Sequence, residues 1–197
     1  MAVLGVGVGA AAGFAEAGAR WTFFEIDPYV VWLARDSGLF AYLPGKVPDA
    51  RIVTGDGRLA LADDAGTYDL IVADAFAGGY PPIHLLTAEA LGVYQERLGR
   101  GGVLAVNASS RYLDLVGVVA ATADRVGLTG YVRHDRGMGR AAHYATTWIV
   151  LAADPAALEP VVRREAGWER LEAGGRAPWT DRRADLVGAL GLFRGGS

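Results

Sequence analysis

Glycines and acidic residues recur at four places in the first half of the sequence, each at the end of a short apolar run. Gly5, Gly7 and Gly9 form a glycine-rich turn, which lets a ligand approach the backbone at the electropositive start of a helix. Glu25 lies 20 residues after Gly5, a spacing typical of an acid that accepts hydrogen bonds from both ribose hydroxyls of an adenosine ligand. The turn and the acid together predict a nucleoside site.

Two aspartates extend this pattern. Asp56 lies between two glycines after the next apolar run, where adenosine-binding transferases have an acid that accepts a hydrogen bond from the adenine amino group. Asp74 ends the run Tyr68–Asp74, at the switch point of the predicted sheet, so its carboxylate should face the reacting end of a bound cofactor.

Each of these residues also has a purely structural interpretation, which the sequence leaves open. The glycine turn could join a strand to a helix without a ligand, and the acids could be strand-end, turn or capping residues. Asp27 could share the role of Glu25, but an aspartate before Pro28 is equally a helix N-cap.

Apolar runs alternate with segments of helical periodicity, which predicts βαβ units in a parallel sheet with helices on both faces. The last two strands follow one another directly, which predicts an antiparallel closing hairpin. The expected fold class is α/β, a Rossmann-like seven-stranded mixed sheet of the class I S-adenosylmethionine-dependent methyltransferase type, in one domain over residues 1–197. Strands are expected at 2–8, 21–25, 50–54, 68–74, 103–107, 128–134 and 146–152, and helices at 10–18, 28–36, 58–62, 84–98, 112–126, 155–165 and 181–193.

Composition excludes several other functions. The chain has 197 residues and a formal net charge of −3, which argues against a nucleic-acid partner. No cysteine is present, so a disulfide scaffold, an iron–sulfur cluster and a thiol nucleophile are excluded. Three histidines far apart in sequence give no support to a metal site, and we expect no metal. No apolar run is long enough to span a bilayer, so we expect a cytoplasmic protein with no membrane partner.

The sequence resembles the spermidine synthase family, and most closely the spermidine-synthase-like domains fused to bacterial membrane transporters. The similarity spans nearly the whole chain and is most specific between Asp74 and Leu115. The residues that carry it lie in the segments 21–28, 55–59, 68–76, 83–87, 98–104, 111–115 and 179–181.

This resemblance implies an aminopropyltransferase. Its co-substrate would be decarboxylated S-adenosylmethionine, and its acceptor a diamine such as putrescine. Asp74 matches the acid that takes the proton from the acceptor amine and anchors the cationic substrate. The implied cofactor-contacting residues are Gly5, Gly7, Gly9, Glu25, Ile26, Asp56, Gly57, Asp74 and Ala75, and the residues that could line an amine pocket are Tyr80, His84 and Tyr112.

Three departures from the family pattern bear on the acceptor. The loop after Asp74 has no second acid, because Ala77, Gly78 and Gly79 occupy it. The sequence starts in the first strand, so the usual N-terminal β segment is expected to be missing. Asn107–Ser110 replaces the histidine and asparagine of the fused-domain group.

Other functions fit the same motifs. A methyltransferase would use the glycine turn, Glu25 and Asp56 equally well to bind S-adenosylmethionine, and the missing loop acid favours it over a diamine enzyme. A non-catalytic nucleoside-binding or assembly module is a further alternative, whereas Asp74 and the terminal hairpin disfavour a nicotinamide oxidoreductase. A homodimer is compatible with the sequence.

Overall fold

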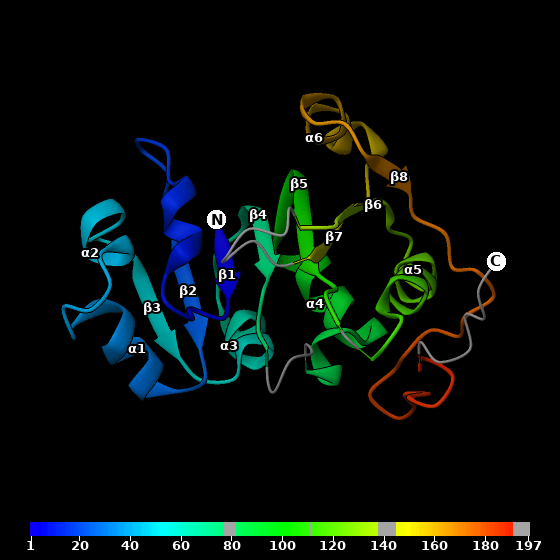
Figure 1. Cartoon of the computed structure of the whole chain (residues 1–197), viewed down its shortest axis with the longest axis horizontal. Helices are drawn as coiled ribbons and strands as arrows, with labels where there is room; N and C mark the ends of the chain where they lie inside the picture. Colours follow the sequence, from blue (N-terminus) through cyan, green and yellow to red (C-terminus); the bar gives the residue numbers. More distant parts are fainter. Residues whose placement is uncertain (77–81, 111, 138–144, 191–197) are drawn as a thin grey trace.

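One mixed sheet forms the centre of the molecule (Figure 1). The computed structural model describes residues 1–76, 82–110, 112–137 and 145–190. Within these residues the strand order is β3-β2-β1-β4-β5-β7-β6-β8. The strands are β1 (Ala2–Leu4), β2 (Thr22–Glu25), β3 (Arg51–Thr54), β4 (Tyr68–Ala73), β5 (Leu98–Asn107), β6 (Thr129–Asp135), β7 (Thr146–Ala152) and β8 (Trp168–Arg170).

The first five strands are parallel, and β7 lies antiparallel between β5 and β6. The predicted α/β class, mixed sheet and closing hairpin are therefore confirmed. The described sheet has one strand more than the seven predicted, because β8 pairs antiparallel with β6. With three residues, β8 is too short to produce a recognisable period in the sequence.

Helices cover both faces of the sheet, as predicted. Alternate residues of β1 point to opposite faces, so Leu4 packs in one hydrophobic core and Val3 in another. The first core lies under α3 (Gly57–Asp63), α4 (Ala88–Arg97) and α5 (Leu115–Arg125). The opposite face carries the 3-10 helix η1 (Ala10–Phe14), α1 (Pro28–Arg35), α2 (Tyr42–Lys46), η3 (Pro155–Leu158) and α6 (Glu159–Arg164).

Several predicted helices have different bounds. The helix expected at 10–18 is the short 3-10 helix η1, and the helix expected at 84–98 is divided into η2 (Ile83–Leu85) and α4. The helix expected at 155–165 is divided into η3 and α6, and α2 was not predicted. Residues 181–190 of the helix expected at 181–193 form turns and isolated bridges, so that prediction was wrong for the described part.

Backbone hydrogen bonds hold the ends of the first four strands together. Asp74 N donates to Leu4 O at 3.0 Å, and Gly5 N donates to Phe24 O at 2.8 Å. Gly55 N donates to Glu25 O at 2.8 Å. The turns that follow β1, β2, β3 and β4 therefore meet at one edge of the sheet, which we call the carboxyl edge.

Candidate nucleoside-binding and active site

The glycine turn at the carboxyl edge is closely packed against the end of β4. Gly5 has φ +95°, and a Cβ atom there would lie 2.7 Å from the Asp74 carbonyl oxygen. Only glycine fits this position without displacing the backbone. Gly7 also has a positive φ, but nothing lies within 4 Å of where its Cβ would be. The middle of the turn is therefore open, and the first glycine brings β1 and β4 together.

The Glu25 side chain reaches back over this turn. Its Oε2 atom accepts a hydrogen bond from Val6 N at 2.9 Å, and its Oε1 atom accepts one from Asp27 N at 3.0 Å. Asp27 itself accepts from Tyr29 N at 2.8 Å and is the N-cap of α1, which is the structural alternative that the sequence left open. Glu25 is thus the acid that borders the glycine turn, and Asp27 has a capping role.

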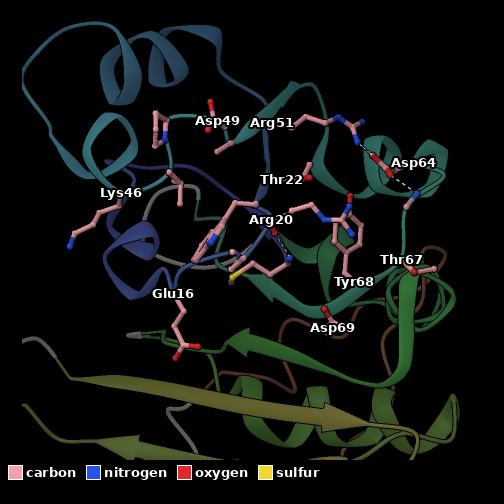
Figure 2. A pocket seen from close by; sticks show the side chains of 18 of the residues that line it. Glu16, Arg20, Thr22, Lys46, Asp49, Arg51, Asp64, Thr67, Tyr68 and Asp69 are labelled. Carbon is pink, nitrogen blue, oxygen red and sulfur yellow. Dashed lines mark hydrogen bonds and ion pairs between the residues drawn. The ribbon is translucent and has the colours of Figure 1, made fainter.

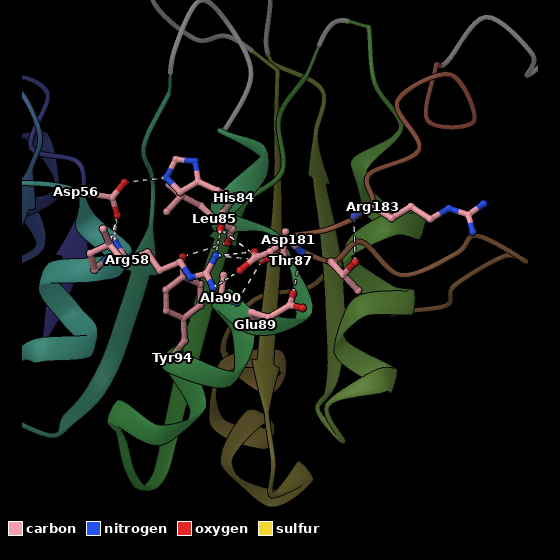
Figure 3. A network of polar contacts seen from close by, with 12 residues as sticks. Asp56, Arg58, His84, Leu85, Thr87, Glu89, Ala90, Tyr94, Asp181 and Arg183 are labelled. Carbon is pink, nitrogen blue, oxygen red and sulfur yellow. Dashed lines mark hydrogen bonds and ion pairs between the residues drawn. The ribbon is translucent and has the colours of Figure 1, made fainter.

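Asp56 combines a capping role with a contact to a predicted pocket residue. Its Oδ1 atom accepts hydrogen bonds from Arg58 N and Leu59 N, both at 3.0 Å, and so caps α3. Its Oδ2 atom lies 3.0 Å from Nε2 of His84 (Figure 3). The structure therefore brings together two residues that the sequence assigned to different subsites.

Asp74 lies next to the glycine turn and is held by Asn107, the last residue of β5. The Asn107 Nδ2 atom donates to Asp74 Oδ1 at 2.8 Å. No other residue in the described ranges donates a hydrogen bond to the Asp74 side chain. Burial raises the pKa of Asp74, and the hydrogen bond from Asn107 opposes this shift. Asn107 therefore fixes one oxygen of the Asp74 carboxylate, and among the described residues no donor to the other oxygen is present.

Asn107 belongs to a chain of hydrogen bonds that fixes its amide. The Asn107 Oδ1 atom accepts from Ser109 N at 3.1 Å and from Ser109 Oγ at 2.6 Å. Ser109 Oγ in turn accepts from Thr147 N at 2.9 Å. Since the amide oxygen is occupied, Nδ2 must point toward Asp74. Sequence reasoning noted Asn107 only as a departure from the family pattern and missed this role.

The other predicted site residues are dispersed. Gly57 is the first residue of α3 and packs against Leu4, and Ala75 is partly buried against the core. Ile26 and Tyr112 are each 67% exposed. Tyr80, Gly78 and Gly79 lie outside the described residues.

A hollow lies at the opposite edge of the sheet, where the strands begin (Figure 2). It encloses about 1310 Å³ and is bordered by Thr22, Arg51 and Tyr68, which are the first residues of their strands. An ion pair between Arg51 and Asp64 at 2.5 Å lies on its wall. Ligands of open α/β sheets bind at the carboxyl ends of the strands, so this hollow is separate from the predicted site.

Neither a metal-ion cluster nor a membrane-spanning helix is found among the described residues. They contain no group of three or more His, Asp or Glu side chains that could hold a metal ion. None of the helices they form is long and apolar enough to cross a membrane.

Known proteins that are similar to this chain in sequence or in fold include spermidine synthases and a methyltransferase-like protein. A polyamine aminopropyltransferase from Vibrio vulnificus (strain CMCP6) is 39% identical over 90 residues, which are 44% of this chain and 28% of the relative. A probable spermidine synthase from Corynebacterium glutamicum ATCC 13032 superposes with a TM-score of 0.67 at 18% identity, covering 94% of this chain and 73% of the other. The resemblance to spermidine synthases is confirmed.

Two further structures support the same fold. A spermidine synthase solved with the transition-state analogue AdoDATO has a TM-score of 0.56 at 16% identity, covering 97% of this chain and 64% of the synthase. Human methyltransferase-like protein 13, solved with SAH, has a TM-score of 0.59 at 22% identity, covering 85% of this chain and 83% of the other. No protein-family model matches the chain. Together the solved structures show that the chain has the class I methyltransferase-like fold.

Proposed function

We propose that the chain binds decarboxylated S-adenosylmethionine at the carboxyl edge and transfers its aminopropyl group to a small amine, such as putrescine, with Asp74 as the general base. The observation that carries the proposal is the placement of Asp74. Its backbone packs against Gly5 of the glycine turn, and Oδ1 of its carboxylate accepts a hydrogen bond from Asn107 Nδ2 at 2.8 Å.

The hydrogen-bonding chemistry of the site suits the nucleoside. An adenosine group offers ribose hydroxyls and an adenine amino group, all of which donate hydrogen bonds, and carboxylates are acceptors. Glu25 and Asp56 supply carboxylates at the ends of adjacent strands β2 and β3. Within the described structure, Asp56 Oδ2 and both Glu25 oxygens have one contact each and so retain an acceptor lone pair, whereas Asp56 Oδ1 uses both of its lone pairs on the amides of α3. The solved neighbours with AdoDATO and SAH support an S-adenosylmethionine-type co-substrate.

The proposed reaction needs a base and correct orientation. Asp74 accepts a proton from the ammonium group of the acceptor, which leaves an amine lone pair. The amine nitrogen then bonds to the carbon next to the sulfonium, and the carbon–sulfur bond breaks with its electrons going to sulfur. The products are the aminopropylated amine and methylthioadenosine. Alignment of the two substrates supplies much of the rate enhancement.

The proposed amine pocket lies at the carboxyl edge of the sheet. His84 and Tyr112 border the same edge of the sheet, and we propose that they and Tyr80 contact the acceptor. His84 contacts a proposed nucleoside residue, because its Nε2 atom lies 3.0 Å from Asp56 Oδ2. Without an acid at positions 77–79, Asp74 would provide the main negative charge for the cationic substrate.

Calorimetric titration with decarboxylated S-adenosylmethionine, S-adenosylmethionine and methylthioadenosine tests this function. We expect the decarboxylated form to bind more tightly than the intact one. Asp74→Asn should abolish transfer and leave methylthioadenosine binding largely unchanged. Asp69→Asn is a matched control, because Asp69 is an exposed aspartate on the same strand. Full activity of Asp74→Asn would remove Asp74 from the base role.

A methyltransferase is the second candidate. The specific observation in its favour is the absence of an acid at positions 77–79, since a methyl acceptor need not be a dication. The same titration separates the two functions, because a methyltransferase would prefer intact S-adenosylmethionine. Binding of none of the three compounds would contradict both enzymes and favour a non-catalytic module.

A further inference from the structure

A segment near the end of the chain contacts the start of α3 (Figure 3). Asp181 Oδ1 and Oδ2 accept hydrogen bonds from Nη1 and Nη2 of Arg58 at 2.7 and 2.8 Å, which is the paired geometry of a strong arginine–carboxylate bond. Thr87 Oγ1 donates to the same Asp181 Oδ1 at 2.7 Å. We call residues Trp179–Arg183 the C-terminal clamp.

The C-terminal clamp is anchored independently of Arg58. Trp179 is only 1% exposed, and its backbone N donates to Thr122 Oγ1 of α5 at 3.1 Å. Its carbonyl oxygen accepts from Ala88 N of α4 at 2.9 Å. The Asp181 backbone N donates to Glu89 Oε2 at 3.0 Å. Contacts with α4 and α5 therefore hold the segment that carries the Asp181 carboxylate in a fixed position.

Arg58 connects this anchor to the candidate nucleoside residues. Its backbone N donates to Asp56 Oδ1 at 3.0 Å, and its Nη1 donates to His84 O at 3.1 Å. The His84 ring in turn contacts Asp56 Oδ2, so that Arg58, His84 and Asp56 form one connected set of contacts. The Arg58 side chain is only 14% exposed, so its guanidinium depends on protein partners. Without Asp181 it would keep the His84 carbonyl and a longer contact of 3.4 Å to Thr87 Oγ1.

We propose that Asp181 is a positioning residue of the nucleoside site, acting through Arg58 on Asp56 and His84. The inference rests on the proposed function, because it assigns Asp56 to the nucleoside. Asp181 itself touches no reacting atom. Its carboxylate holds the guanidinium, which in turn fixes the first turn of α3 and the His84 backbone in one relative position.

The test measures methylthioadenosine affinity by calorimetry in the wild type, Asp181→Asn, Arg58→Gln and the double variant. We expect Asp181→Asn to bind about fivefold more weakly, at the low end of typical coupling between sites. Because Asp181 acts through Arg58, the double variant should bind no more weakly than Arg58→Gln. In turnover, KM for the nucleoside co-substrate should rise while kcat stays near that of the wild type, and Asp181→Glu should recover part of the affinity.

Asp185→Asn is the matched control. Asp185 is an exposed aspartate four residues further along the chain, and its Oδ1 atom accepts a hydrogen bond from Gly188 N rather than from Arg58. It should leave affinity and KM unchanged. Wild-type affinity in Asp181→Asn, or additive losses in the double variant, would overturn the inference.

Amide hydrogen exchange separates this inference from the proposed function. The Leu59 amide donates to Asp56 Oδ1 at 3.0 Å, so its exchange reports on the turn that Asp56 caps. We expect faster exchange in Asp181→Asn and no change in Asp185→Asn. A wild type that binds no methylthioadenosine would contradict the proposed function, and unchanged Leu59 exchange would contradict the inference whatever the binding result.

Discussion

Asn107→Leu is the sharpest test of how the protein sets the protonation of Asp74. The substitution removes the Nδ2 donor that lies 2.8 Å from Asp74 Oδ1. Asn107 is 9% exposed, and leucine has the same number and branching of side-chain heavy atoms, so the position stays filled. The substitution also removes the acceptor of Ser109 N and Ser109 Oγ, but at the Asp74 carboxylate itself the change is the lost donor.

The expected size of the change in kcat/KM follows from the loss of this one hydrogen bond. Hydrogen bonds to charged groups contribute about 1.5–3 kcal/mol, and since Asp74 is only partly buried we take the low end of that range. About 1.4 kcal/mol corresponds to a factor of about ten between the two protonation states. Loss of the donor raises the pKa of Asp74 further above its usual range, in the same direction as burial. A general base must be ionised, so kcat/KM on the acidic limb should fall about tenfold.

The assay is a pH profile of kcat/KM for aminopropyl transfer in the wild type and the variant. We expect the acidic limb to move to higher pH while the plateau at high pH changes little. Ser110→Ala serves as the control, because Ser110 Oγ accepts from Tyr112 N and Leu113 N and does not contact Asn107. A loss of equal size at every pH would refute the reasoning, since it would mean that Asn107 acts only on the position of Asp74 or on folding.

Four further outcomes are expected. Gly5→Ala should lower the free energy of unfolding by about 2–3 kcal/mol in urea denaturation, because the new Cβ would lie 2.7 Å from a carbonyl oxygen, whereas Gly7→Ala should lose only about 1 kcal/mol. Glu25→Gln should weaken methylthioadenosine binding about tenfold in calorimetry, and unchanged affinity would contradict the ribose assignment. The bond to Arg58 lowers the pKa of Asp181 to about 2 from 3.8, so the extra stability of the wild type over Asp181→Asn should be present at pH 5–7 and disappear as the pH falls toward 2 in urea titrations. Trp179→Ala should cost about 3–5 kcal/mol in the same assay, because the indole is buried, and a loss below about 1 kcal/mol would contradict its anchoring role.

Local patterns in the sequence determined most of the fold. Apolar runs of strand length and glycines at strand ends predicted β1 to β4 and their parallel order, because these signals depend on neighbours a few residues away. The Thr146–Ala152 strand was predicted with its observed bounds. The sequence could predict that Glu25, Asp56 and Asp74 lie at one edge of the sheet, because parallel strands place their carboxyl ends together.

Only the tertiary structure decided the partners of those acids. Asn107 lies 33 residues from Asp74, and Asp181 lies 123 residues from Arg58, and no local period connects residues so far apart. The segment after Trp179 shows the same limit. Its apolar spacing predicted a helix, but the buried indole and the bonds of Asp181 hold residues 181–190 in turns, since tertiary contacts outweigh weak helix propensity.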